Sequence, residues 1–92
     1  MAANKQLALA RDVHVDESDV HILMTDGREI AIPFQRYRFL RDAGQTERAD
    51  CIVDEGGTVI FWPRLREGIS VAGLIGVTEE ELVLFAEGAR TR

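Results

Sequence analysis

The chain has 92 residues, 46% of them hydrophobic, and a formal net charge of −5. Since domains typically need about 100–150 residues, residues 1–92 are expected to form a single domain with one thin core. Self-association, as in a homodimer, would bury more apolar surface. The acidic charge argues against direct capture of nucleic acid, because that requires a basic face to displace counterions.

The chain has one cysteine, Cys51, so neither an internal disulfide nor a cage of several thiolates can form. Cys51 lies in an apolar run typical of a strand, which indicates a small buried side chain. No run approaches the ~20 apolar residues of a membrane span. The first residues lack the layout of a signal peptide. We therefore expect a cytoplasmic protein that contacts no membrane.

Alternating apolar residues predict strands in the first third of the chain. Residues 7–15 alternate like a half-buried strand with a break near their middle, and residues 20–25 alternate more regularly. Asp26-Gly27 predicts a tight hairpin turn, because such turns need positive φ angles. Residues 28–32 then return as the second strand, and Pro33 ends it because proline cannot donate to the ladder.

The middle of the chain changes from helical to strand spacing. Apolar residues at helical intervals predict a helix over residues 34–43 that ends at Gly44. A loop is expected over residues 45–48. Residues 49–53 and 58–62 alternate again and predict a second hairpin.

Two helices are predicted near the C-terminal end. Ser70 is expected to open a short helix that reaches Ile75. Thr78 and Glu81 fit a capping box, so a final helix should follow and end at Gly88. Its apolar residues run nearly all the way round the helix, and one sheet face cannot cover them: Leu82, Val83, Leu84, Phe85 and Ala86. A partner or a second copy is expected to dock there.

Together these elements predict an α+β fold. An antiparallel sheet of about five strands, built from two β-hairpins and an N-terminal strand, should be packed with two to three short helices.

A series of residues with characteristic order and spacing runs through more than half of the chain: Asp26-Gly27-Arg28, Pro33, Tyr37, Leu40, Glu47-Arg48, Gly57, Ile60, Trp62-Pro63, Leu65, Glu67, Ile69-Ser70-Val71 and Gly73-Leu74. With this series, the stretch from about residue 20 to residue 77 resembles a bacterial family called domain of unknown function 2442. The resemblance implies a small α+β fold with an antiparallel sheet and helices.

The resemblance also implies an accessory role. Members often lie beside another small protein in an arrangement similar to a toxin–antitoxin pair, and some carry a DNA-binding helix-turn-helix downstream. This chain departs from the pattern at Arg66-Glu67-Gly68, where an acidic cluster is expected. It has no room for a downstream helix-turn-helix, so DNA binding by that route is not implied.

The residue types that carry catalysis form no recognisable pattern. His14 and His21 flank the acids Asp16, Glu17 and Asp19, and imidazole with carboxylate suits several divalent ions. The spacing matches no established ligand pattern, however, and the acids are typical of a solvated turn. The serines and the cysteine lack the neighbours that activate a nucleophile. We therefore predict no catalytic residue, no metal and no cofactor.

Two surfaces are candidates for binding a partner. The first is the apolar patch of the last helix, formed by Leu82, Val83 and Phe85. The second is basic and aromatic, a composition typical of interface anchors and of single-strand platforms: Arg36, Tyr37, Arg38, Arg41, Trp62, Arg64 and Arg66. The simpler explanation is a solvated helix face and a core tryptophan, and the burial of Trp62 decides between them.

Acidic side chains also gather at both predicted hairpins: Asp12, Asp16, Glu17 and Asp19, then Asp50, Asp54 and Glu55. A negative surface can steer a basic partner or imitate the phosphates of a nucleic acid. Ordinary solvation explains the same pattern.

The sequence thus favours a non-enzymatic protein-binding module, an antitoxin-like accessory or regulator. It would mask a neighbour-encoded protein by burying the apolar patch while charged residues set the register. The alternative is a phage-type inhibitor or acidic nucleic-acid mimic that blocks a basic groove of a nucleic-acid-processing complex. A third hypothesis is a small enzyme that uses His14 or His21.

Overall fold

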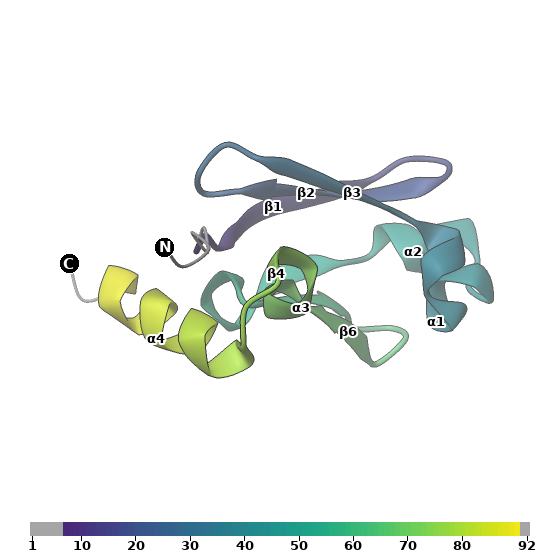
Figure 1. Ribbon diagram of the computed structural model, residues 1–92. Helices are drawn as coiled ribbons and strands as arrows, with labels where there is room; N and C mark the ends of the chain where they lie inside the picture. Colours follow the sequence, from purple (N-terminus) through teal and green to yellow (C-terminus); the bar gives the residue numbers. More distant parts are fainter. Residues whose placement is uncertain (1–6, 91–92) are drawn as a thin grey trace.

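The structure is a computed structural model that describes residues 7–90, with side chains described to residue 88. The α+β class predicted from the sequence is confirmed (Figure 1). The strands are β1 (Ala10–Val15), β2 (Asp19–Met24), β3 (Glu29–Pro33), β4 (Ile52–Asp54), β5 (Val59–Trp62) and β6 (Glu67–Ser70). The helices are α1 (Arg38–Arg41), α2 (Gln45–Ala49), α3 (Val71–Ile75) and α4 (Glu79–Arg90), and the short 3-10 turns are η1 (Phe34–Arg36) and η2 (Glu55–Gly57).

The strands form two three-stranded antiparallel sheets, in the orders β1-β2-β3 and β4-β5-β6, instead of one sheet of five. One reason for the difference is β6. Residues 67–70 form this strand, although Glu67-Gly68 breaks the apolar alternation that would have predicted it. It pairs with β5, placing Ile69 opposite Ile60. The second reason is that both sheets need a cover for an apolar face, and each covers the other (Figure 1).

The first sheet follows the predicted hairpin. Gly27 has a φ of 92°, as the Asp26-Gly27 turn requires. β2 lies in the centre, with Val20, Ile22 and Met24 fully buried on its inner face. The predicted break in the N-terminal strand is a register shift between Ala10 and Asp12. As a result His14 lies directly opposite His21 on the outer face.

The helical region after Pro33 differs from the single predicted helix. Tyr37 is extended, with φ −123° and ψ 126°, so η1 and α1 are separate turns. Residues 45–49, mostly predicted as loop, form α2. Glu47 stabilises its start, since its Oε1 accepts a hydrogen bond of 3.0 Å from the Gly44 amide.

The C-terminal helices largely follow their predicted signals. Thr78 Oγ1 accepts from the Glu81 amide at 3.0 Å, and Glu81 Oε1 accepts from the Thr78 amide at 2.9 Å, which confirms the capping box. Ser70 stands at the N-cap of α3 but makes no side-chain cap. α4 continues through Gly88, so the predicted end there was wrong. A glycine costs a helix only about 1 kcal/mol, which does not stop one that is already capped.

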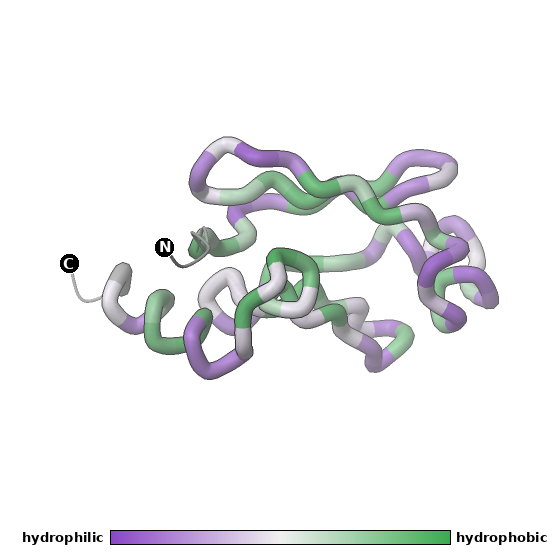
Figure 2. Tube along the Cα trace, viewed as in Figure 1, coloured by the Kyte–Doolittle hydropathy of each residue, from purple (hydrophilic) through white to green (hydrophobic). Residues whose placement is uncertain are grey.

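One hydrophobic core lies between the two sheets and is closed at its ends by helices. Figure 2 shows hydrophobic stretches along the strands and α3, with hydrophilic turns at the periphery. Trp62 is fully buried in this core. Its Nε1 donates a hydrogen bond of 2.9 Å to the Arg48 carbonyl, and the Phe39 ring meets it edge-on at 5.3 Å.

Candidate functional site

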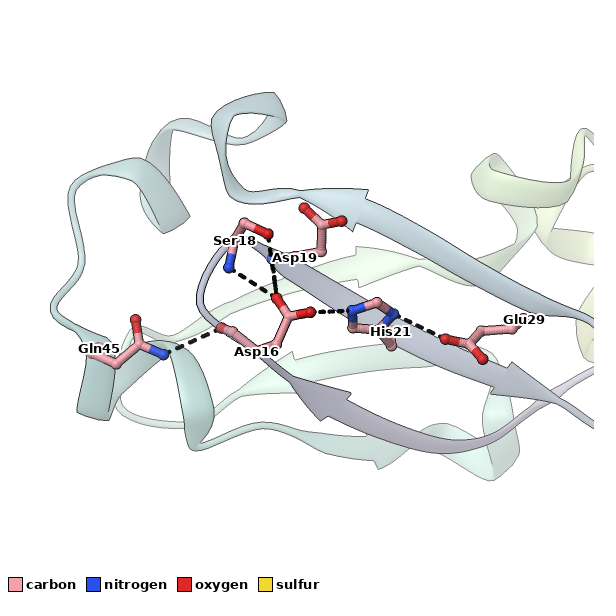
Figure 3. A network of polar contacts seen from close by, with 6 residues as sticks. All are labelled: Asp16, Ser18, Asp19, His21, Glu29 and Gln45. Carbon is pink, nitrogen blue, oxygen red and sulfur yellow. Dashed lines mark hydrogen bonds and ion pairs between the residues drawn. The ribbon is translucent and has the colours of Figure 1, made fainter.

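The outer face of the β1-β2-β3 sheet carries a compact polar cluster (Figure 3). His21 lies between two carboxylates, with Nε2 at 2.7 Å from Asp16 Oδ2 and Nδ1 at 2.9 Å from Glu29 Oε2. The His14 ring stacks on His21 with centroids 4.8 Å apart and planes 7° from parallel. We call these four residues the histidine cluster.

Strand register brings the histidine cluster together. Side chains alternate between the faces of a strand, and Val20, Ile22 and Met24 of β2 point into the core, so His21 points outward. Glu29 reaches the same face from β3, two residues before Ala31, which pairs with His21. Asp16 comes from the turn after β1, where its Oδ1 accepts from the amides of Ser18 and Asp19 at 2.8 and 2.7 Å. Gln45 of α2 donates to the Asp16 carbonyl at 3.3 Å (Figure 3).

These contacts shift the two central ionisable groups in opposite directions. The hydrogen bonds from the Ser18 and Asp19 amides, followed by that from His21, hold the pKa of Asp16 well below its ordinary value. The hydrogen bond to Asp16, reinforced by Glu29, raises the pKa of His21 above its ordinary value. The pair is therefore stabilised in its doubly charged form.

The cluster also gathers groups that bind metal ions. One ligand atom from each of His14, His21 and Glu29 lies within 4.8 Å of the other two. The sequence spacing hides this arrangement because the three residues come from three strands, and Glu29 was not a candidate in the sequence analysis. Two signals in the sequence could have placed Glu29 beside His21. They are the alternation of residues 20–25 and 28–32, and the strand register that the Asp26-Gly27 turn sets.

The apolar patch predicted on the last helix is partly exposed. Val83, Leu84 and Phe85 are 43%, 60% and 37% exposed. Leu82, by contrast, is 1% exposed on the inner side of α4, which corrects its prediction as a binding residue. From here on, the apolar patch means Val83, Leu84 and Phe85. Beside it, residues of β5 and α4, among them Val59 and Val83, line a hollow of about 160 Å³.

The predicted basic and aromatic surface is not assembled as one unit. Trp62 is a core residue and no interface anchor, because it is fully buried, its ring meets Phe39 and its Nε1 is bonded to the Arg48 carbonyl. Tyr37 is half-buried against Phe39, at 5.9 Å between ring centroids. The arginines are exposed and lie on η1, on α1 and in the β5–β6 turn: Arg36, Arg38, Arg41, Arg64 and Arg66.

Two of these arginines have acidic partners within the chain. Arg38 Nε lies 3.9 Å from Asp42 Oδ2, and Arg64 Nε lies 3.4 Å from Asp50 Oδ2. Figure 1 places α1 toward the opposite end of the molecule from α4. The arginines of α1 therefore lie on a surface distinct from the apolar patch.

Cys51 is half-buried just before β4, and so less buried than its apolar surroundings predicted. Burial, followed by the charge of Asp50, raises the pKa of its thiol to about 11. A nucleophilic cysteine needs the opposite shift. Cys51 is thus held in the unreactive thiol form at neutral pH.

A family model for proteins of unknown function, DUF2442, matches residues 10–76 of this chain. The chain belongs to the DUF2442 family. The match begins at β1, ten residues earlier than the resemblance seen in the sequence, and it ends before α4. No curated protein matches the chain.

A solved structure supports the same fold. It is the crystal structure of a protein of unknown function from Rhodospirillum rubrum ATCC 11170, with a TM-score of 0.71 and 20% sequence identity. The likeness covers 84% of this chain and 99% of that chain. Among residues 7–90, no helix is long and apolar enough to cross a membrane.

Proposed function

We propose that this DUF2442 protein is a non-enzymatic, antitoxin-like accessory or regulatory module that binds another protein through α4. The observation that carries the proposal is the exposed run of Val83, Leu84 and Phe85. Successive helix positions lie about 100° apart, so these three side chains spread over the outer half of α4. Among the described residues only one other large hydrophobic, Ile52, is exposed, so α4 carries most of the exposed large apolar surface. The inner side of the same helix already closes the core through Leu82 and Ala86, so the outer side is available to a partner.

Charge favours a partner that is a different, basic protein. The first turn of α4 carries Glu79, Glu80 and Glu81, and the whole chain has a net charge of −5. An apolar groove rimmed by lysine or arginine would complement this helix. A second copy would bring the same acidic turn to the interface and fits less well. The resemblance of the family's gene arrangement to toxin–antitoxin pairs supports a partner encoded beside this chain.

The alternative of a nucleic-acid mimic has less support. A mimic needs carboxylates that are free to meet a basic groove, but three of the acids proposed for it have partners inside the chain. Asp16 pairs with His21, Asp50 pairs with Arg64, and Asp54 accepts a hydrogen bond of 2.9 Å from the Glu55 amide.

The test is capture from the organism that encodes the chain, with matched baits. Leu84→Glu and Phe85→Glu place a charge in the apolar patch, and Ile52→Glu makes the same kind of change at a residue of β4 that is 45% exposed. We expect the wild type and Ile52→Glu to capture one stoichiometric neighbour-encoded protein. Affinity should then be measured between the purified partner and each purified variant. Both α4 variants should bind the partner at least about tenfold more weakly than the wild type, because a large apolar side chain that the interface no longer buries costs more than ~1.4 kcal/mol of binding free energy.

Three results would contradict the proposal. Unchanged affinity of both α4 variants would remove α4 from the interface. A wild-type dimer in light scattering that Leu84→Glu dissociates would assign the patch to a second copy. Capture of a nucleic-acid-processing complex that high salt releases, equally with all baits, would favour the acidic mimic.

A further inference from the structure

We infer that the outer face of the first sheet holds a divalent transition-metal site, with His14, His21 and Glu29 as protein ligands and Zn²⁺ as the ion that fits best. The inference is independent of the proposed binding surface on α4. It contradicts the sequence-based expectation of no metal, and it rests on a juxtaposition of three strands that spacing along the chain does not reveal.

The donor set selects the class of ion. Two imidazoles and one carboxylate, with a water in the fourth position, form a common tetrahedral zinc environment. Magnesium and calcium prefer oxygen ligands throughout and are poorly matched to two nitrogens. Because the ligand atoms already lie within 4.8 Å of one another, small side-chain movements suffice to surround one ion.

The ligands combine one fixed group with two adjustable ones. His21 is held between its carboxylate partners and its side chain is 19% exposed, whereas the Glu29 side chain is 52% exposed and His14 is exposed. His14 and Glu29 can therefore rotate toward an ion while His21 stays in place. The ion would replace the hydrogen bond between His21 Nδ1 and Glu29 Oε2, which are 2.9 Å apart. Tetrahedral zinc ligands at about 2.0 Å lie roughly 3.3 Å from one another, so a small rotation of Glu29 suffices.

Asp16 supplies the outer partner that metal-binding histidines usually have. With Nδ1 on the metal, the Nε2–H of His21 continues to donate to Asp16 Oδ2, now at 2.7 Å. Such a carboxylate fixes the tautomer and orientation of the ring and increases its basicity as a ligand. Asp16 suits this role better than direct coordination, because the Ser18 and Asp19 amides hold its other oxygen in the turn.

The test uses the full chain with any affinity tag removed and with metals stripped by EDTA. Calorimetric titration with ZnCl₂ should give saturable binding of one ion per chain, and MgCl₂ should give none. NMR spectra should show Zn²⁺ moving the imidazole signals of both histidines. These are the chain's only two histidines, so the assignment is direct.

Variants separate the roles. His14→Ala and His21→Ala should abolish saturable binding, and Glu29→Gln should weaken it. Asp16→Asn should weaken it by about 10–100-fold, as expected for an outer partner. Glu67→Gln, which removes the same charge from an exposed residue of the second sheet, should bind like the wild type. If His21→Ala fails to fold, His14→Ala decides, because His14 is exposed.

Several outcomes would overturn the inference: no saturable binding by the wild type, equal binding of Mg²⁺ and Zn²⁺, or wild-type affinity in His14→Ala. One zinc shared by two chains would also overturn it, since the site is complete within one chain. Wild-type affinity in Asp16→Asn would remove Asp16 from the site.

Discussion

At the scale of single residues, His21 has the most unusual surroundings in the described part of the chain. Both ring nitrogens face carboxylates, at 2.7 and 2.9 Å, on a surface that water reaches. Asp16 is the stronger determinant of the two, because backbone amides fix its position in the turn. This arrangement explains why the pKa of His21 is raised while the pKa of Asp16 is lowered.

The opposite shifts predict a defined pH dependence in EDTA. The contribution of His21 is fully present below its ordinary pKa of 6.5 and is lost as the pH rises through its raised value. That of Asp16 is present above its ordinary pKa of 3.8 and is lost as the pH falls toward its lowered value. The pair should therefore stabilise the fold most between these two ordinary pKa values, as urea unfolding at a series of pH values would measure.

Asp16→Asn should lower the pKa of His21, measured by NMR titration of the imidazole signals. It should also reduce the loss of stability that the wild type shows above the ordinary pKa of His21 and below that of Asp16. Glu17→Gln removes the same charge from the same turn without that hydrogen bond and should change the pKa of His21 less. Equal effects of the two variants would show that general electrostatics, and not the Asp16 contact, control His21.

At the scale of elements, Arg48 of α2 contacts three other elements: η1, α1 and β5. Its Nε donates to the Leu40 carbonyl at 2.7 Å and its Nη2 to the Arg41 carbonyl at 3.1 Å, which satisfies the last turn of α1. The guanidinium lies 4.6 Å from the centre of the Phe34 ring. The carbonyl of Arg48 accepts from Trp62. A residue predicted to lie in a loop thus holds η1, α1 and β5 together.

Arg48→Ala should lower the free energy of unfolding by about 1–3 kcal/mol, because two carbonyls lose a charged donor and the Phe34 ring loses its cover. Arg48→Lys should recover only part of this loss, since an ammonium cannot reproduce the planar fork of donors. Urea unfolding measures both. Arg41→Ala, at an exposed position on α1, is the control and should stay within about 0.5 kcal/mol of the wild type.

At the scale of the whole molecule, the two sheets approach each other closely at Gly57. This residue has a φ of 97°, and a Cβ added there would lie 2.8 Å from both the Ala10 carbonyl oxygen and the Leu9 Cβ. Contacts of that length require the backbone of the first sheet to move. The missing side chain of Gly57 therefore allows η2 to lie close to the start of β1. This contact in turn limits the distance between the two sheets.

Gly57→Ala and Gly27→Ala form a matched pair that isolates this close approach. Both glycines have a similar positive φ, but a Cβ at Gly27 meets no atom within 4 Å. Each substitution should cost about 1–2 kcal/mol for the left-handed backbone. Gly57→Ala should cost a further 1–3 kcal/mol or so for overpacking. Thermal or urea unfolding measures both variants. If the two substitutions lowered the free energy of unfolding equally, the close contact at Gly57 would not constrain the distance between the sheets.

Local chemistry predicted the features that depend on neighbours in the chain. The Asp26-Gly27 turn, the Thr78–Glu81 capping box and the alternation of β2 follow from φ preferences, short-range hydrogen bonds and a period of two. The α+β class and the family follow from such signals taken together.

Contacts between distant segments settled the rest. The separation into two sheets, the enclosure of Trp62 and the meeting of Asp16, His21 and Glu29 all depend on the register and packing of strands. Register places residues from different strands on one face, and burial depends on which face the second sheet covers. Both are settled by long-range burial of apolar surface, for which no short pattern in the chain is a signature.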